Sequence, residues 1–195
     1  MSSTINKYQL EKLGNTLVYL ANNVGEFQKT KALKLLFLLE ENSIKKYGIP
    51  FFGFDFKVWQ FGPVNEQVYE SLNSDDLTMV NSFIRRVNNF PDEFEASAEF
   101  NDDEFSQNDM ELLDEVVRFA RHKTAKDLVR ITHGKDSLWR KKAKEEGIYE
   151  KLEKSQITKT DILIDFSKLL DGDEYLKERY IGALEHIDFT TQINA

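Results

Sequence analysis

Histidine, serine, threonine and carboxylate side chains are the groups in this sequence that could carry out acid–base, nucleophilic or metal chemistry. His122, His133 and His186 are too irregularly spaced to indicate a metal cluster. The chain has no cysteine, which excludes disulfides, Cys-based zinc sites, iron–sulfur clusters and thiol nucleophiles. A Ser-His-Asp triad assembles in space rather than along the chain, so the sequence leaves one open, but nothing local supports it.

Motifs for nucleotide and metal binding are missing as well. The sequence has no glycine-rich phosphate loop, dinucleotide fingerprint, His-Glu-x-x-His helix or calcium loop, and its nine glycines are scattered at the ends of predicted elements. We therefore expect a protein that is not an enzyme and that binds no metal, nucleotide or other cofactor.

Charge is distributed unevenly along the chain, which has a formal net charge of −8. No Lys or Arg occurs between Val87 and Val117, whereas the stretch 118–144 is strongly basic. The net charge argues against a protein that wraps duplex nucleic acid, since such binding depends on clustered Lys and Arg. The acidic stretch could instead contact a cationic partner through Glu95, Glu99, Asp102 and Asp103, or it could simply solvate an exposed edge.

The elements that must position these groups are predicted to be mainly helical. Apolar residues spaced by three and four predict a first helix from Leu10 that ends near Gly25. Thr30 is predicted to cap a second helix, whose residues 32–39 are almost all apolar and should form the centre of the core.

Extended structure is predicted next. Phe52, Phe54 and Phe56 alternate with small or polar residues, and Gly62 should end this strand, with Pro63 opening a helix. A short helix is expected to end near Val87. Residues 94–100 alternate as a second strand, and a return strand could begin at Phe105.

The remaining helices carry their own start signals. Ser106 with Asp109 and Thr124 with Asp127 predict two capped helices. Thr160 is predicted to cap a further helix, and Gly172 to separate it from the last one. The expected fold is mostly α with a small β-hairpin or sheet element, with one compact domain over 1–145 and a helical extension over 146–195 packed on it.

No apolar run approaches the roughly 20 residues that a membrane-spanning helix needs. The N-terminal residues also lack the apolar core of a signal peptide. We therefore expect a cytoplasmic protein with no membrane partner.

Several segments together resemble the Panacea domain of SocA-like antitoxins. They are the helix Lys31-Ala-Leu-Lys-Leu-Leu-Phe-Leu38, then Phe56-x-x-Trp59, Phe61-Gly-Pro-Val64, Val68-Tyr69 and the later Thr132-His133 with Trp139. Phe61 stands where the family usually has Tyr, and Ala32 where Leu is common. The resemblance runs from about Leu10 to Trp139, and the stretch after Lys144 resembles nothing that we can name.

The resemblance implies a compact, mostly helical, phage-associated antitoxin that binds a cognate protein toxin encoded next to it. A protease or chaperone would be a further partner if the protein delivers its toxin for degradation. The residues expected to form the family scaffold are Leu35, Leu36, Phe37, Trp59, Phe61, Gly62, Pro63, Val64, Tyr69, His133 and Trp139. The residues considered for partner contact are Phe51, Phe52, Glu95, Glu99, Asp102, Asp103 and Arg140.

A different class of function is a phage or transcriptional regulator that binds nucleic acid through the basic stretch 118–144, with Trp139 as a stacking residue. That function requires these side chains to share one face. Helical spacing brings Arg118, Arg121 and His122 together, but it separates Lys141 and Lys142 from them.

Overall fold

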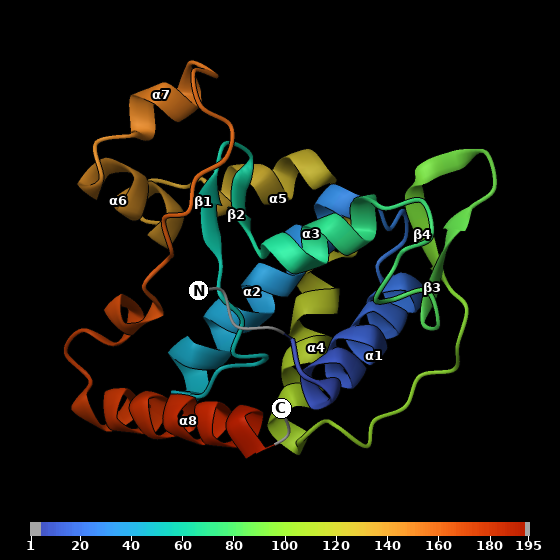
Figure 1. Cartoon of the computed structure of the whole chain (residues 1–195), viewed down its shortest axis with the longest axis horizontal. Helices are drawn as coiled ribbons and strands as arrows, with labels where there is room; N and C mark the ends of the chain where they lie inside the picture. The colour runs from blue at the N-terminus through green and yellow to red at the C-terminus, as the bar shows by residue number, and fades with distance from the viewer. Residues whose placement is uncertain (1–4, 194–195) are drawn as a thin grey trace.

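A long helix, α2 (Lys29–Tyr47), runs through the middle of the molecule, and most other elements pack around it (Figure 1). The computed structural model describes residues 5–193. Residues 1–4 and 194–195, which begin the predicted domain and end the predicted extension, lie outside the described residues.

Within that range the chain forms eight α-helices, one 3-10 helix and two small antiparallel sheets. The remaining α-helices are α1 (Lys7–Asn23), α3 (Glu66–Asn73), α4 (Gln107–Ala120), α5 (Ala125–Thr132), α6 (Leu138–Glu145), α7 (Tyr149–Glu153) and α8 (Glu174–Ile193). The strands are β1 (Lys57–Trp59), β2 (Gly62–Val64), β3 (Ile84–Val87) and β4 (Phe90–Ala96), and η1 (Phe166–Leu170) is the 3-10 helix. The predicted mostly α fold with small hairpins is confirmed.

The first two helices form largely where the sequence indicates. Asn6 caps α1 by accepting a hydrogen bond from the Gln9 backbone, and the Gln9 side chain completes the capping box. In α2 every residue from Ala32 to Leu39 is buried, as predicted for the core helix. The predicted Thr30 cap is wrong: the N-cap is Gln28, which makes no side-chain capping bond.

The aromatic segment before β1 is less regular than predicted. Residues 51–56 are irregular, with the four Phe side chains buried, and only Lys57–Trp59 pairs as a strand, with Trp59 opposite Gly62. The rings pack inward, with Phe52 and Phe54 stacked at 4.8 Å and Phe37 edge-on to Phe56 at 5.4 Å. Packing into the core therefore decided the backbone here, rather than alternation across a sheet.

The predicted position of Pro63 at the start of a helix was also wrong. It lies in β2, opposite Val58, and not in the first turn of a helix. Helix α3 begins at Glu66, where Asn65 caps it by accepting a hydrogen bond of 3.0 Å from the Val68 amide.

The second hairpin replaces two predicted elements. A strand, β3, occupies the stretch where a helix was predicted to end near Val87, and it pairs with β4 rather than with a strand starting at Phe105. The predicted strand 94–100 is shifted: β4 covers 90–96, and an irregular connection over 97–106 leads to α4. Phe94 is the buried side chain of β4 and anchors the hairpin to the core.

The two predicted capping boxes of α4 and α5 are both present, at Ser106 and Thr124. Thr160 caps nothing. Its hydroxyl donates to the Val58 carbonyl at 2.7 Å, and the neighbouring backbone lies beside β1, with the Val58 amide donating to the Ile162 carbonyl at 2.9 Å.

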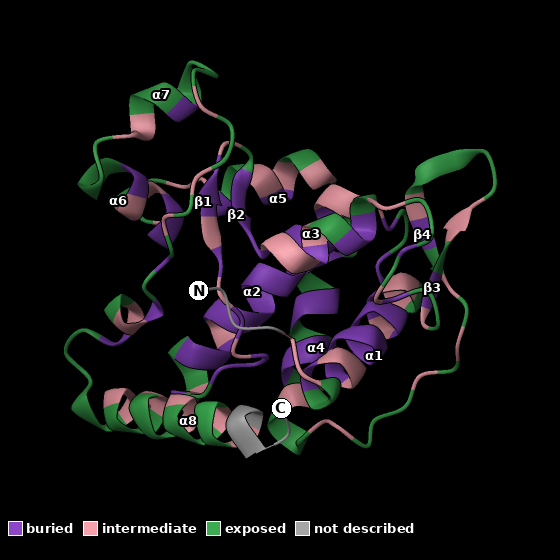
Figure 2. Ribbon diagram, in the orientation of Figure 1, coloured by how far each residue is buried: buried purple, intermediate pink, exposed green. Residues whose placement is uncertain are grey.

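Burial falls off outward from α2 (Figure 2). The core includes α2 and the inner faces of α1 and α4, whereas α7 and α8 are mostly exposed or half-buried. Two charged residues of α2, Lys34 and Glu40, lie inside this core at 1% exposure each. Isolated charges are costly to bury, so their partners matter for the candidate site.

Candidate partner-binding site

The tight turn between β1 and β2 is held against α2 by a crowded contact at Gly62. Gly62 has a φ of 102°, which side chains with a Cβ rarely adopt. A Cβ at this position would lie 2.8 Å from Lys34 Nζ and 2.9 Å from His133 Nε2. Both the backbone angle and the space therefore require glycine.

Lys34 reaches the turn from the core side. Its Nζ donates a hydrogen bond of 3.1 Å to the Pro63 carbonyl, and burial lowers its pKa to about 7. The lysine therefore links α2 to β2. Because of its lowered pKa, a part of the amine is uncharged near neutral pH.

His133 closes the other side of the turn. Its ring stacks on Trp139 with centroids 3.9 Å apart and an interplanar angle of 12°. Burial, with the Lys34 charge as a smaller cause, lowers the pKa of His133 to about 4, so the ring is neutral at pH 7. Trp139 in turn donates from Nε1 to the Trp59 carbonyl at 2.8 Å, which joins α6 to β1.

Phe61 is the outward-facing residue of this turn. Its side chain is 68% exposed, the largest exposure among the large hydrophobic residues that the structure describes. Behind it, Trp59 is 5% exposed and packs edge-on against Tyr69 at 5.0 Å. The turn thus presents one apolar ring on a rigid, buried base, which is the arrangement of an anchor residue in a protein interface.

A family model described as "Antitoxin SocA-like, Panacea domain" matches residues 33–140, more than half of the chain. The chain belongs to this family of SocA-like antitoxins. The matched Panacea domain begins inside α2 and ends inside α6, so it contains the whole Gly62 contact. No match was found among curated proteins or among solved structures.

Most of the scaffold residues expected of the Panacea domain lie in or near the core. Leu35, Leu36, Phe37, Trp59, Gly62, Pro63, Val64 and Trp139 are buried, and Tyr69 and His133 are half-buried. Phe61 is the exception, because its side chain is exposed, so the prediction that it belongs to the scaffold was wrong. Phe61 is carried at the tip of a two-residue connection, where no neighbouring element covers it.

Two of the predicted partner contacts are also wrong. Phe51 and Phe52 are 2% and 3% exposed, because their rings pack edge-on at 4.6 Å and the Lys12 ammonium lies 4.5 Å from the centre of the Phe51 ring. Arg140 is half-buried, with its guanidinium bonded to the Tyr149 hydroxyl and lying over that ring.

The four acidic candidates are exposed but do not share one hairpin. Glu95 lies in β4 and pairs with Arg85 at 2.8 Å. Glu99, Asp102 and Asp103 lie in the 97–106 connection, so the acidic surface of this Panacea protein is a loop rather than a strand edge.

The basic stretch 118–144 is spread over the end of α4, all of α5 and most of α6. Trp139 is 1% exposed and cannot stack on a base, which corrects the sequence hypothesis. Some of the cations are already paired within the chain, such as Lys142 with Glu146 at 2.6 Å and Arg130 with Asp127 at 3.5 Å.

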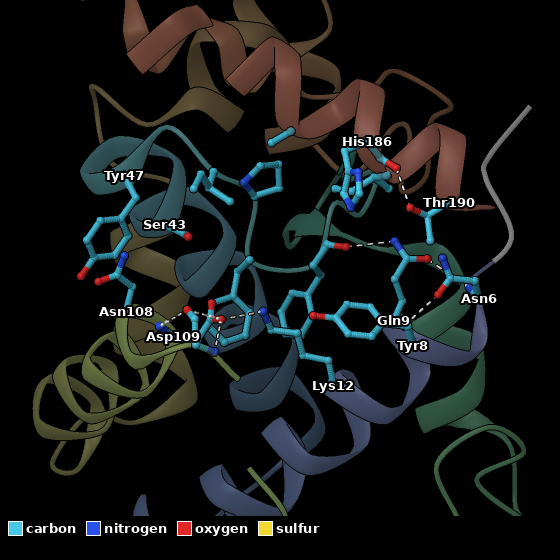
Figure 3. A pocket seen from close by; sticks show the side chains of 17 residues that line it. Asn6, Tyr8, Gln9, Lys12, Ser43, Tyr47, Asn108, Asp109, His186 and Thr190 are labelled. Atoms are coloured by element: carbon cyan, nitrogen blue, oxygen red, sulfur yellow. Dashed lines mark hydrogen bonds and ion pairs between the residues drawn. The ribbon is translucent and has the colours of Figure 1, made fainter. Parts of the chain in front are cut away.

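A pocket of about 530 Å³, which the sequence did not indicate, lies between α8 and the ends of α1, α2 and α4 (Figure 3). Lys12 lies at this pocket and pairs with Asp109 at 3.0 Å. Nearby, the buried Glu40 accepts the Phe52 amide at 2.7 Å and the Gly53 amide at 3.1 Å, and burial raises its pKa to about 7. Lys12 and Glu40 therefore have partners within the chain, whereas the buried Tyr47 hydroxyl, which also lines the pocket, has no hydrogen-bond partner among the described residues.

Lys12, Lys34 and Glu40 are the polar residues that sequence reasoning missed. The available signal was a charged residue on a predominantly apolar helical face, which is rare without a structural partner. Residues 5–193 contain no group of three or more His, Asp or Glu side chains that could hold a metal ion. In the same range, no helix is both long and apolar enough to cross a membrane.

Proposed function

We propose that this protein is an antitoxin that neutralises a cognate protein toxin by direct contact. The observation that carries the proposal is the Panacea-domain match over residues 33–140. The geometry supports a contact through Phe61, because an exposed aromatic ring on a rigid base loses little conformational freedom when a partner covers it.

The test begins with a search for a small reading frame that adjoins the gene of this protein. Expression of its product alone should stop growth, and co-expression with the antitoxin should restore it. The two proteins should also co-purify. Normal growth with the product alone, or arrest that co-expression does not relieve, would count against the proposal.

A variant of the exposed ring locates the contact. Phe61→Ser should leave the melting temperature almost unchanged, because the side chain is largely in water already, and it should weaken toxin binding by about tenfold or more. The matched control is Phe90→Ser, which alters a 59% exposed phenylalanine on the other hairpin and should leave binding unchanged. If the two variants changed toxin binding equally, Phe61 would not be a specific contact in the interface.

Neutralisation by occlusion and delivery to a protease make different predictions about toxin abundance. Occlusion leaves the toxin intact in the complex, whereas an adaptor that recruits a protease or chaperone lowers its steady-state level. Immunoblotting of the toxin during co-expression, with and without a block of proteolysis, distinguishes the two modes.

A further inference from the structure

Residues 155–164, which we name the strap, lie along the outer edge of β1 like an extra strand (Figure 1). The Gln60 amide donates to the Thr158 carbonyl and the Val58 amide to the Ile162 carbonyl, both at 2.9 Å, and the Ile164 amide donates to the Phe56 carbonyl at 2.8 Å. The strap lies outside the Panacea match, yet it pairs with the strand that leads into the Gly62 turn.

Side chains fix the strap against the aromatic base of that turn. Lys159 Nζ lies 4.3 Å from the centre of the Trp59 ring and 5.1 Å from that of Tyr69. Trp59 Nε1 donates to the Thr160 carbonyl at 3.1 Å. The strap therefore satisfies the hydrogen bonds of an open strand edge and places a cation on an aromatic pair.

The middle of the strap is weakly covered compared with its end. Lys159 and Asp161 are exposed, and Leu163 is 44% exposed, whereas Ile164 is 6% exposed and anchors the segment in the core. Segments with few buried contacts open locally without global unfolding. An opened strap would leave the edge of β1, Trp59 and Tyr69 free beside the exposed Phe61.

We propose that the strap occupies, in the free protein, the place of an extended toxin segment, and that toxin binding displaces it from β1. This inference rests on the proposed function. The toxin segment would add to the edge of β1 through its backbone and would place a Lys or Arg on Trp59 and Tyr69, as Lys159 does. A cationic segment also suits a protein with a net charge of −8.

Amide hydrogen exchange tests the opening without any toxin. The Val58 and Gln60 amides should exchange faster than the Leu36 amide of the core helix, because local opening exposes them. The double variant Lys159→Gln, Thr160→Val should accelerate their exchange by about tenfold. It removes the Lys159 cation and the Thr160 hydroxyl, two of the side-chain contacts that hold the strap, and leaves the Lys57–Asp161 pair in place.

The matched control is Lys154→Gln, which removes a nearby lysine that pairs with Glu150 and does not touch β1. It should leave the exchange of both amides unchanged. Exchange of Val58 and Gln60 at the rate of Leu36, in the wild type and in the double variant, would overturn the inference.

A synthetic peptide with the sequence of residues 155–165 tests the docking. Added to the double variant of the full chain, it should shift the emission of Trp59, and the same peptide carrying Lys159→Gln should bind about tenfold more weakly. No emission change at any peptide concentration would show that the edge does not accept a strand in trans.

The product of the adjoining reading frame completes the test. It should associate faster with the double variant than with the wild type, because the edge of β1 is open for more of the time. An unchanged association rate would show that displacement is not part of binding. Binding to neither form would overturn the proposed function instead, and the peptide result would still decide whether β1 accepts an extended segment.

Discussion

The side chains of Lys34 and His133 both lie against Gly62, and their positions require that residue 62 has no side chain. The lysine bonds to the backbone of β2, the histidine stacks on Trp139, and glycine leaves room for both. Since the turn they hold carries Phe61, the position of the candidate anchor depends on residues that are buried or half-buried behind it.

The substitution Gly62→Ala should reduce the free energy of unfolding by about 2 to 4 kcal/mol, because a methyl group adds a contact below 3 Å to an unfavourable backbone angle. Gly147→Ala is the control, since its φ of 67° is also positive but no atom lies within 4 Å of the added Cβ. Urea unfolding measures both. Equal losses would mean that the Lys34 and His133 contact costs nothing.

Lys34 should also make stability depend on pH. Its folded pKa of about 7 is below the usual 10.5, so between these values the unfolded chain binds a proton that the folded chain does not. The stability of the wild type relative to Lys34→Met should therefore rise from about pH 7 to pH 10, by a few kcal/mol. Exposed Lys154→Met should show no such trend, and a flat difference for Lys34→Met would contradict the pKa.

At the scale of elements, the helix starts are local and the contacts between elements are not. The hydroxyls of Ser106 and Thr124 cap α4 and α5 by accepting hydrogen bonds from backbone amides three residues further along. In contrast, β1 is joined to α6 through Trp139 and to the strap through hydrogen bonds between residues about a hundred positions apart in the chain. Removing a cap should therefore weaken one helix, whereas loosening the strap should leave the helices intact.

The substitution Thr124→Ala should lower the free energy of unfolding by about 1 kcal/mol, because the Asp127 amide loses the hydroxyl that accepts its hydrogen bond. Thr124→Ser keeps that hydroxyl and should cost much less. Thermal melts of the two variants at the same pH give the comparison, and a loss of the same size in both would assign the effect to the lost methyl group.

At the scale of the whole molecule, the fold places the acidic and the basic stretches of the sequence on different parts of the surface. The acidic stretch supplies the exposed 97–106 connection, and the basic stretch is divided among three helices with several cations paired internally. This favours long-range attraction of a cationic protein over binding of a polyanion.

The triple change Glu99→Gln, Asp102→Asn and Asp103→Asn should slow toxin association and reduce its dependence on salt, while dissociation changes little. The control is Glu153→Gln, Glu174→Gln and Glu178→Gln, which removes the same charge from exposed sites on α7 and α8. Stopped-flow association at two salt concentrations separates them. Equal slowing would mean that only net charge matters, and no slowing in either would exclude steering.

The sequence by itself determined what depends on neighbours a few residues away. Apolar spacing located α1 and α2, the Ser106 and Thr124 boxes located α4 and α5, and Gly62 marked the tight turn that forms part of the family motif. Only the tertiary structure decided that Phe51 and Phe52 are buried, that Phe61 is exposed and that Pro63 lies in a strand. It also decided that Thr160 holds the strap on β1 instead of capping a helix. The physical reason is that exposure and edge pairing depend on which distant segments cover a residue, and the types of its neighbours in the chain do not encode that.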